Sequence, residues 1–326
     1  MSRIASEAAF LGLIDRHFPR RHDAVSLHRG DDAAVLDLPG RICLTADLFL
    51  EDAHFRRAYF SPGDIGYKAL AVNVSDLAAM GARPLGFALV LTTPADADAD
   101  FWDGVFAGMA GLADALDLPL VGGDLNRGPG VALAVTAWGG AGPSGRFLTR
   151  GNGRPGDALF VVGEVGLAAV GLHVLEASGR AAMESWPVAT TAHLRPAVRV
   201  EAGLALAAVP GLRGAMDVSD GLAADLPRFL APGTGADIRL DPSWLHPEVV
   251  AHAASRGLDP AEAAFLGGED YALFGAVAPE ALPEVLRAVP TARPIGTVTP
   301  APGILLNGRP VTGRGFDHFG SSPCSS

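Results

Sequence analysis

Two segments of the sequence carry the same carboxylate motif. Val-Ser-Asp occurs in NVSDLAAM at residues 73–80 and again in DVSDGLAADL at residues 217–226. In the first segment Asn73 and Asp76 are three positions apart, so both side chains share one face if the segment is helical. In the second segment, acids flank a serine just before an alanine-rich run, where a helix is expected to begin. Such a helix would offer its positive end to a phosphate.

Further acids recur beside glycines or at the ends of strand-like segments. They are Asp31 and Asp32 after Gly30, Asp47 after ICLTA, Asp124 after Gly122 and Gly123, Asp217 and Asp220 around Ser219, and Glu269 and Asp270 after Gly267 and Gly268. Carboxylates that converge repel one another and are costly to desolvate, so such a set requires cations. Hard carboxylate oxygens suit Mg²⁺, which usually keeps waters and shares its coordination with substrate phosphates. The pattern therefore indicates Mg²⁺-dependent nucleotide chemistry.

Each motif alone also fits a structural role. GDD is a common surface turn, and paired glycines after a strand can simply make a tight connection. Asp220 alone would serve as a helix N-cap, and Asp76 could belong to a solvated helix face. His54 alone would be read as a surface histidine or one satisfied within the fold. Only the whole set, taken in order, favours the functional interpretation.

The elements that must position these acids alternate between helices and strands. SPGD predicts a helix start, with Ser61 as N-cap, Pro62 at the first helical position and Asp64 in the first turn, and Gly81 predicts its end. We expect further helices near residues 6–18, 97–116 and 260–266 and after residue 221, strands near residues 41–50, 85–93, 118–124, 131–140, 236–240 and 271–277, and a strand followed by a helix within residues 158–175. This alternation is typical of an α/β or α+β fold.

The chain is long enough for two domains, since its 326 residues exceed what one hydrophobic core usually serves. The segment at residues 139–157 is rich in Gly and Pro and is the expected boundary. We predict an N-terminal domain at residues 1–145, a C-terminal domain at residues 146–320 and a disordered tail at residues 321–326.

Composition excludes several classes of function. The net charge of −11, without a visible basic patch, disfavours nucleic-acid binding. The most apolar run, residues 158–175, contains Glu164, His173 and several glycines, so no membrane span is expected. The N-terminus lacks a signal-peptide pattern and two cysteines suggest no disulfide framework, so we expect a cytoplasmic protein. A P-loop lysine motif is absent from the sequence, so ATP would be held by acids and metal.

Ten ordered segments of the chain resemble the thiamine-monophosphate kinase family. They are GDDAAV, TADLFLEDAHF, GYKALAVNVSDLAAMGARP, GGDLNRG, LTRGNGRPGD, HLRP, MDVSDGLAADL, GGEDYAL, IGTV and GFDHFG. This family belongs to the superfamily of aminoimidazole ribonucleotide synthetase. The resemblance implies a two-domain α/β (α+β) fold, in which the sheet of the N-terminal domain forms a homodimer and the C-terminal α/β domain covers the nucleotide.

The resemblance also implies a reaction. The γ-phosphoryl group of ATP would pass directly, in line, to thiamine monophosphate, giving thiamine diphosphate and ADP in the final step of thiamine diphosphate biosynthesis. Metal neutralisation and positioning supply most of the catalysis in phosphoryl transfer, so no covalent enzyme intermediate is needed. The acceptor is already an ionised phosphate, so a strong general base is not required.

Matching the motifs assigns roles to individual residues. The residues expected to hold Mg²⁺ are Asp32, Thr45, Ala46 (through its backbone carbonyl), Asp47, Asp76, Asp124, Asp217 and Asp220, of which Asp124, Asp217 and Asp220 are also the expected catalytic acids. The residues expected to contact ATP are Gly123, Asp124, Arg150 and Ser219. The residues expected to contact thiamine monophosphate are His54, Glu269 and Phe316.

The sequence departs from the family pattern at two places. Ala46 replaces a frequent hydroxyl residue, and Leu125 with Asn126 replaces the usual Thr after GGD, which puts that loop's hydroxyl contact in doubt. Neither change removes a carboxylate.

Rival functions within the superfamily fit less well. A ligase or synthetase would lose the acceptor residues, and selenophosphate synthetase would need a reactive cysteine near the N-terminus, which is absent. A hydrogenase-maturation protein should end in cysteine, whereas Cys324 is followed by two serines. A non-enzymatic sensor would have lost the metal-binding acids, and here the set is complete.

Overall fold

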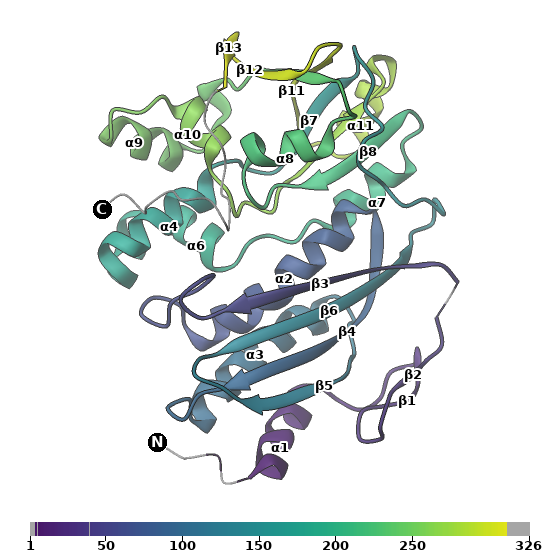
Figure 1. Ribbon diagram of the computed structural model, residues 1–326, viewed down its shortest axis with the longest axis vertical. Helices are drawn as coiled ribbons and strands as arrows, with labels where there is room; N and C mark the ends of the chain where they lie inside the picture. The colour runs from purple at the N-terminus through teal and green to yellow at the C-terminus, as the bar shows by residue number, and fades with distance from the viewer. Residues whose placement is uncertain (1–3, 5, 39, 312–326) are drawn as a thin grey trace. The chain divides into compact units, whose positions relative to one another are not determined.

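The computed structural model describes residues 4, 6–38 and 40–311. The chain forms two compact units, residues 1–146 and residues 147–326, which we call the N-terminal unit and the C-terminal unit. Each has its own sheet and its own helices (Figure 1). Phe316 and the predicted tail at residues 321–326 lie outside the described residues.

The N-terminal unit is built on a four-stranded sheet in the order β3-β6-β4-β5. All neighbours are antiparallel except β4 and β5, and a separate antiparallel hairpin, β1-β2, precedes the sheet. The strands are β1 (Val25–Leu27), β2 (Val35–Leu36), β3 (Ile42–Leu50), β4 (Ala82–Thr93), β5 (Leu120–Arg127) and β6 (Ala132–Ala141). The helices are α1 (Glu7–His17), α2 (Pro62–Ala79) and α3 (Ala99–Ala115).

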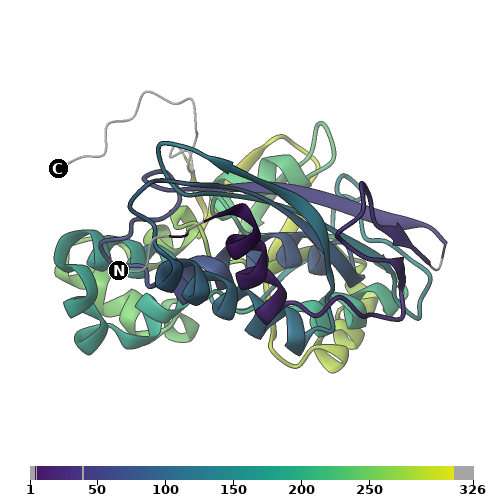
Figure 2. The same ribbon diagram turned by 90° about the horizontal axis from the view of Figure 1, so that it is seen from below.

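Helices cover one face of this sheet, whereas on the other face the β1–β2 hairpin packs around Trp138. Helix α2 packs on β3, β4 and β6, and α3 packs on α2 (Figure 2). Leu89, Leu133 and Val135 point to this covered side, which we call the inner face, and are buried there. The opposite, outer face carries Leu44 and Val90, which are exposed. The alternation of side chains along each strand therefore assigns every residue of the sheet to one face.

The predicted start and end of α2 are confirmed. The Ser61 hydroxyl accepts a hydrogen bond from the Asp64 N–H at 3.2 Å, and the Asp64 carboxylate accepts one from the Ser61 N–H at 3.1 Å, forming a capping box. Pro62 occupies the first turn, where its missing N–H has no partner to lose. Gly81 follows the helix at φ +64°, a conformation that favours glycine.

The strand predicted near residues 41–50 is confirmed as β3, with Asp47 inside it. The strand end predicted at Asp124 is wrong, because β5 continues to Arg127. The reason is the ladder beyond each acid: β3 stays paired with β6 as far as Leu50, and β5 stays paired with β4 as far as Arg127. Polar residues that follow a glycine pair can thus remain in a strand when a neighbouring strand supplies hydrogen bonds.

The C-terminal unit contains a seven-stranded sheet in the order β13-β12-β9-β11-β7-β10-β8, in which only β12 and β9 are parallel. The strands are β7 (Ala158–Val162), β8 (Leu212–Asp217), β9 (Gly235–Ile238), β10 (Leu273–Val277), β11 (Ala292–Thr299), β12 (Gly303–Leu306) and β13 (Arg309–Pro310). The α-helices are α4 (Leu167–Ser178), α5 (Ala182–Ser185), α6 (Pro187–Leu194), α7 (Val200–Ala208), α8 (Leu222–Phe229), α9 (Pro247–Ser255), α10 (Pro260–Leu266) and α11 (Leu282–Ala288). Short 3-10 helices are η1 (Gly179–Ala181), η2 (Pro242–Trp244) and η3 (Pro279–Ala281).

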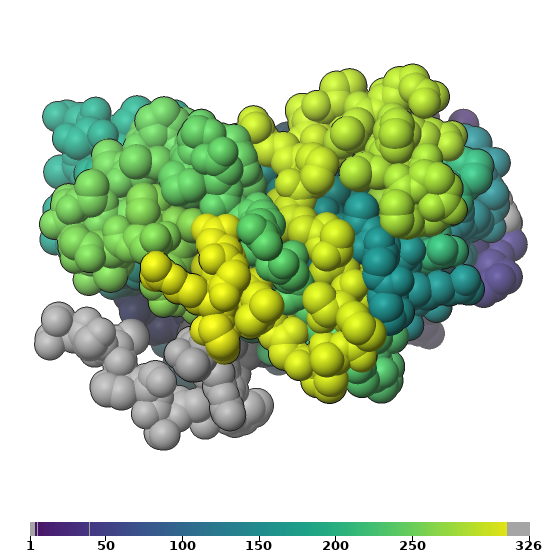
Figure 3. Space-filling view, turned by 90° about the horizontal axis from the view of Figure 1, so that it is seen from above, coloured from purple at the N-terminus to yellow at the C-terminus, as the bar shows by residue number. Residues whose placement is uncertain are grey.

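The core of the C-terminal unit lies between its sheet and the helices α4, α8, α9 and α10. Leu159, Val161, Phe229, Phe265 and Phe274 are fully buried there. Within the unit, α9 and α10 lie on one side of β12 and α11 lies on the other (Figure 3). The central strands β7 and β10 are buried along their whole length, which explains why the sequence shows them as continuous apolar runs.

Helices α2 and α3 approach closely because glycines face each other at their contact. A Cβ added to Gly108 would lie 2.0 Å from the Gly63 carbonyl oxygen, and one added to Gly66 would lie 1.8 Å from the Val105 carbonyl oxygen. A Cβ added to Gly111, one turn further along α3, would have no atom within 4 Å. The tight packing therefore depends on particular glycines and not on the glycine content of α3.

We expect Gly108→Ala to lower the free energy of unfolding by about 1–3 kcal/mol, because the methyl group has no space. Gly111→Ala on the same helix is the matched control and should leave stability unchanged or raise it by up to about 1 kcal/mol, through helix propensity. Urea unfolding of the two variants beside the wild type measures both changes. Equal stability of the two variants would contradict the close packing.

Candidate functional site

The inner face of the N-terminal sheet brings three predicted site residues together. The Thr45 hydroxyl on β3 donates a hydrogen bond to the Asp76 carboxylate on α2. Asp47 follows Thr45 by two positions, so it lies on the same face of the strand. Burial, and then the negative charge of Asp76, raise the pKa of Asp47 to about 6. The strand and the helix thus hold two carboxylates close enough to repel each other.

Ala46 is on the other face of β3, opposite Thr136 of β6. Its side chain therefore points away from Asp47 and Asp76. Any contact of Ala46 with ligands of the inner face would have to come from its backbone.

Asp124 is also separated from Asp47. In the β4–β5 ladder Asp124 is paired with Val90, whose side chain is exposed on the outer face, whereas Asp47 is paired with Val135 on the inner face. Three strand spacings separate β3 from β5, which amounts to roughly 14 Å. Within one N-terminal unit, the side chains of Asp47 and Asp124 are therefore not at one site.

Gly123 lets β5 approach β4 at this point, since a Cβ on Gly123 would lie 1.7 Å from the Leu89 carbonyl oxygen. The Asn126 side-chain amide donates a hydrogen bond to the Asp124 carboxylate at 2.6 Å. Asn126, a departure from the family pattern, thus orients the acid on the outer face.

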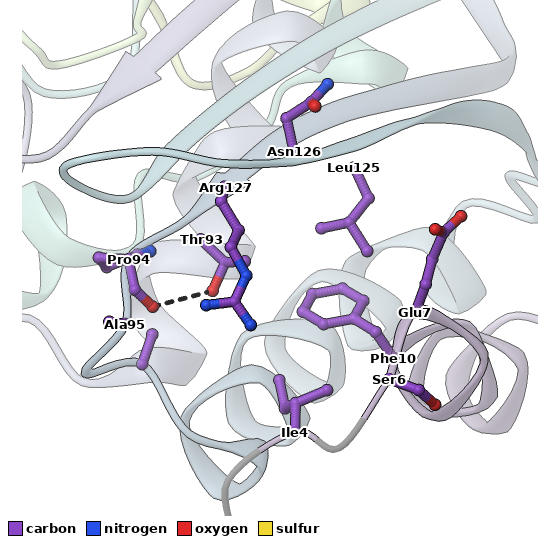
Figure 4. Close-up of a pocket in the computed structure, with 11 residues that line it drawn as sticks. Ile4, Ser6, Glu7, Phe10, Thr93, Pro94, Ala95, Leu125, Asn126 and Arg127 are labelled. Carbon is purple, nitrogen blue, oxygen red and sulfur yellow. Dashed lines mark hydrogen bonds between the residues drawn. The ribbon is translucent and has the colours of Figure 1, made fainter.

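Leu125 contributes to a cavity in the N-terminal unit, of about 200 Å³. Its side chain points toward Phe10 of α1, while Asn126 points away from them on the other side of the strand (Figure 4). The polar residues of the lining are Ser6, Glu7, Thr93, Asn126 and Arg127. Leu125 follows Asp124 in the sequence, but none of the predicted site residues lines this cavity.

His54 and Asp32 occupy separate positions in the N-terminal unit. The Leu50 N–H donates a hydrogen bond to His54 Nδ1 at 3.0 Å, so the neutral ring carries its hydrogen on Nε2. The ring stacks on Phe49, with centroids 5.9 Å apart. Asp32 lies in the exposed turn after Gly30, and its N–H donates to the Asp31 carboxylate at 2.9 Å.

In the C-terminal unit, residues 217–221, which begin at the buried last residue of β8, are hydrogen-bonded to residues 267–271, and we call these segments the two glycine loops. The Glu269 N–H donates to the Ser219 carbonyl oxygen at 2.7 Å, and the Tyr271 N–H donates to the Val218 carbonyl oxygen at 2.9 Å. A Cβ on Gly268 would lie 2.8 Å from the Ser219 carbonyl oxygen. The contact brings together the predicted residues Asp217, Ser219, Asp220 and Glu269.

Helix α8 supplies two partners for Asp220. The Arg228 guanidinium forms an ion pair with the Asp220 carboxylate and a second one, at 3.2 Å, with Asp225. Asp225 is fully buried, and its carboxylate accepts a hydrogen bond from the Asp220 N–H at 3.0 Å. Burial raises the pKa of Asp225 to about 6. Asp225 thus fixes the backbone of the loop while Arg228 balances the charge of Asp220.

Arg150 lies next to the end of α8. The neighbouring Gly151 N–H donates to the Phe229 carbonyl oxygen at 2.8 Å, and the Asn152 side chain donates to the Arg150 carbonyl oxygen at 3.3 Å. These contacts hold the backbone on both sides of an exposed arginine.

Asp270 is a structural anchor of the second glycine loop. Its carboxylate accepts hydrogen bonds from the Gly166 N–H at 2.5 Å and the Ala168 N–H at 2.9 Å, at the start of α4. Burial raises the pKa of Asp270 to about 7, although these hydrogen bonds and the Arg199 charge oppose the shift. The neighbouring Glu269 adopts φ +63°, and its carboxylate is paired with the buried His193.

Sequence reasoning missed three of these residues: Asp225, Arg228 and His193. Asp225 and Arg228 follow the DVSDG motif and are three positions apart. In a helix this spacing brings the two side chains together, so the sequence could have predicted their ion pair. His193 stands in the quoted HLRP segment, but nothing local connects it to Glu269. Only the tertiary structure could reveal that pair.

Within the described residues, no three His, Cys, Asp or Glu side chains gather as a metal-binding group. The closest approach to the predicted set is the pairing of Asp47 with Asp76 beside the Thr45 hydroxyl. In the same part of the chain, none of the helices combines the length and the apolar character needed to cross a bilayer.

Comparison with known proteins agrees with the resemblance in the motifs. Residues 30–141 match AIR synthase related protein, N-terminal domain, and residues 154–306 match AIR synthase related protein, C-terminal domain. The thiamine-monophosphate kinase of Escherichia coli K12 is 37% identical over 94% of this chain and 97% of its own length. This chain belongs to the thiamine-monophosphate kinase family.

Solved structures of the thiamine-monophosphate kinase family show the same fold. The enzyme of Stenotrophomonas maltophilia K279a has a TM-score of 0.79 at 31% identity, covering 95% of this chain and 99% of that one. A complex of AaThiL with AMPPCP and TMP has a TM-score of 0.76 at 26% identity, covering 96% and 97%. The predicted family, the two-domain α/β fold and the prediction of a kinase are confirmed, while the domain limits at residues 145 and 320 stay predictions.

The pKa of Asp270 predicts a pH dependence of stability. Its ordinary pKa is 3.8 and its folded pKa is about 7, so between these values the folded chain holds a proton that the unfolded chain has lost. Protonated Asp270 therefore contributes to the free energy of unfolding in full below about pH 4. This contribution is lost as the pH rises to about 7, and the free energy of unfolding falls by at most about 1.4 kcal/mol per pH unit.

Asp270→Asn is neutral at every pH and retains one acceptor oxygen for α4. We therefore expect the melting temperature of wild type, minus that of Asp270→Asn, to fall between pH 5 and pH 7.5. Comparing the two proteins at each pH cancels the contributions of other groups. A difference that stays constant or grows with pH would disprove the raised pKa.

Proposed function

We propose that this kinase transfers the γ-phosphoryl group of ATP to thiamine monophosphate, producing thiamine diphosphate and ADP in the final step of thiamine diphosphate biosynthesis. The family relatives bear the name of this activity, and AaThiL binds AMPPCP together with TMP. A cytoplasmic location stays a prediction.

The observation that carries the proposal is the contact between the two glycine loops. Ser219, assigned to ATP, and Glu269, assigned to thiamine monophosphate, are joined by the 2.7 Å hydrogen bond between Glu269 N–H and Ser219 oxygen. Phosphoryl transfer needs donor and acceptor within a few ångströms and in line. Adjacent loops that bind one substrate each satisfy this requirement.

The oxygen donors of the chain fit Mg²⁺. Asp47 and Asp76 are close enough for one charge to raise the pKa of the other, which favours a cation between them, and Thr45 adds a hydroxyl oxygen. We assign Mg²⁺ binding to Asp32, Thr45, the Ala46 carbonyl, Asp47, Asp76, Asp124, Asp217 and Asp220. Bound Mg²⁺ would supply positive charge that neutralises the phosphates of both substrates.

The remaining assignments concern binding and orientation. Gly123, Arg150 and Ser219 would contact ATP through backbone N–H groups and the guanidinium charge. His54 would donate from Nε2 to the acceptor phosphate, since Leu50 N–H occupies Nδ1. Glu269 would pair with the cationic or aminopyrimidine part of thiamine, and Phe316 would pack on a flat ring.

With both substrates held, an ionised oxygen of thiamine monophosphate attacks the γ-phosphorus of ATP. The new oxygen–phosphorus bond forms as the bond to the β,γ-bridging oxygen breaks, and ADP leaves with that electron pair. The acceptor oxygen carries no proton, so the chain need not supply a base. The acids Asp124, Asp217 and Asp220 act by organising charge around the transferred group.

We also propose a homodimer formed through the outer face of the N-terminal sheet. Leu44, Leu48 and Val90 are 63%, 49% and 45% exposed on this face, over which none of the described helices of the N-terminal unit packs. Apolar sheet faces of this kind are buried by another layer, and a second copy offers an identical surface. Asp124 lies on the same face, so the partner would lie beside it.

The first test of the function is turnover with ATP, Mg²⁺ and thiamine monophosphate, followed by chromatography of thiamine diphosphate and ADP. We expect equal amounts of both products, and a loss of roughly 100-fold in kcat for Asp220→Asn, because charge stabilisation of the transferred group is removed. Asp241→Asn, at an exposed helix start in the same unit, should keep wild-type activity. ADP without thiamine diphosphate would refute the acceptor.

The homodimer is tested by Leu44→Asp, which places a charge in the proposed interface. Sedimentation velocity should show a dimer for the wild type and a monomer for Leu44→Asp, since an unpaired charge buried at an interface is costly. Leu258→Asp is the matched control because Leu258 is 51% exposed in the C-terminal unit, and it should remain dimeric. A monomeric wild type would rule out this interface.

A further inference from the structure

A buried histidine contacts the carboxylate of Glu269. His193 Nδ1, on α6, lies 2.8 Å from Glu269 Oε2. The His193 side chain is 1% exposed and that of Glu269 is 26% exposed, so the pair extends from the interior of the C-terminal unit to the surface of the two glycine loops. The carboxylate supplies only acceptor oxygens and negative charge, and Nδ1 is the ring atom that faces it at ion-pair distance.

The position of His193 is fixed by its helix. The Glu248 carboxylate accepts hydrogen bonds from the Val188 N–H at 3.2 Å and the Ala189 N–H at 2.7 Å, at the start of α6. Helix α4 crosses α6 at Gly171, where an added Cβ would lie 2.0 Å from the Ala189 oxygen and 2.9 Å from His193 Cβ. The ring therefore has little freedom to move away from Glu269.

The backbone of Glu269 is fixed independently. Its own N–H is bonded to Ser219, and the next residue, Asp270, is bonded to the start of α4. Glu269 adopts a left-handed φ of +63° in a loop that is held on both sides. What remains variable is the direction of the carboxylate, and His193 restrains it.

We propose that His193 is a positioning residue for Glu269, holding its carboxylate ready for the heterocyclic part of thiamine monophosphate. This inference rests on the proposed function of Glu269. A side chain ordered before binding loses less entropy when the ligand arrives, so the restraint strengthens substrate binding without touching substrate. The effect should be confined to thiamine monophosphate, because His193 has no role in the assigned ATP contacts.

Two polar substitutions separate positioning from mere packing. In His193→Asn the amide nitrogen is bonded to Cγ, as Nδ1 is in histidine, so the variant keeps a donor that faces Glu269. His193→Gln carries its amide one carbon further out, where Nε2 stands, and loses that donor position. We expect His193→Gln to raise the KM for thiamine monophosphate roughly tenfold, with kcat and the KM for ATP within about twofold, and His193→Asn to restore most of the affinity.

His252→Gln is the matched control, since His252 is another buried histidine of the C-terminal unit, stacked on His173, and should leave both KM values unchanged. In the Glu269→Gln background, His193→Gln should add no further loss, because the two residues act as one unit. Isothermal titration with thiamine monophosphate and with AMPPCP gives the same comparison without turnover.

Several results would overturn the inference. Equal affinity of His193→Asn and His193→Gln, a parallel loss of ATP affinity, or additive losses in the double variant would show that His193 only packs. A Glu269→Gln variant with wild-type affinity would remove Glu269 from the substrate site, and this inference with it. Failure of the proposed function is distinguished by the wild type alone, which would then form no thiamine diphosphate.

Discussion

The close approach of the two glycine loops determines which side chains of the C-terminal unit can act together. Gly268 packs against the Ser219 carbonyl, and Gly221 packs against Gly267, where an added Cβ would lie 2.7 Å from the carbonyl oxygen. Any side chain at these places would separate the loops by the width of a methyl group or more. The distance between Ser219 and Glu269, and with it the distance between the two proposed substrates, depends on this absence of side chains.

The three acids near this contact, Asp220, Glu269 and Asp270, differ in how their charge is compensated. These differences indicate a different role for each acid. Burial favours the neutral form of Asp270, and the amides of α4 occupy its oxygens, so it stabilises the loop and is not available to ligands. Asp220 is paired with Arg228, whose side chain is 48% exposed. Exposed ion pairs contribute little to stability, so a cation can replace Arg228 at small cost. Glu269 falls between these cases, with one buried partner and an exposed carboxylate end.

How much the sequence predicted depends on whether a feature is local. The capping of α2 follows from Ser61, Pro62 and Asp64 alone, because the energies involved act within one turn. The strand position of Asp124 could not be predicted, since it is set by a ladder with a strand about 35 residues earlier. The pairing of His193 with Glu269 spans still more of the chain and depends on how α6 packs on α4. The family motifs predicted the site residues without revealing their partners.

The two faces of the N-terminal sheet set a further constraint on the proposed site. Side chains alternate strictly along a strand, so Asp47 and Asp124 cannot share one face without a one-residue shift of β3 or β5, which would turn Phe49 or Leu125 to the outer face. An acid is nonetheless held on the outer face by Asn126, beside apolar side chains that stay exposed in the described part of the N-terminal unit. The proposed homodimer accounts for both features at once. Burial of Leu44 and Val90 would supply the association energy, and Asp124 would face the partner instead of solvent.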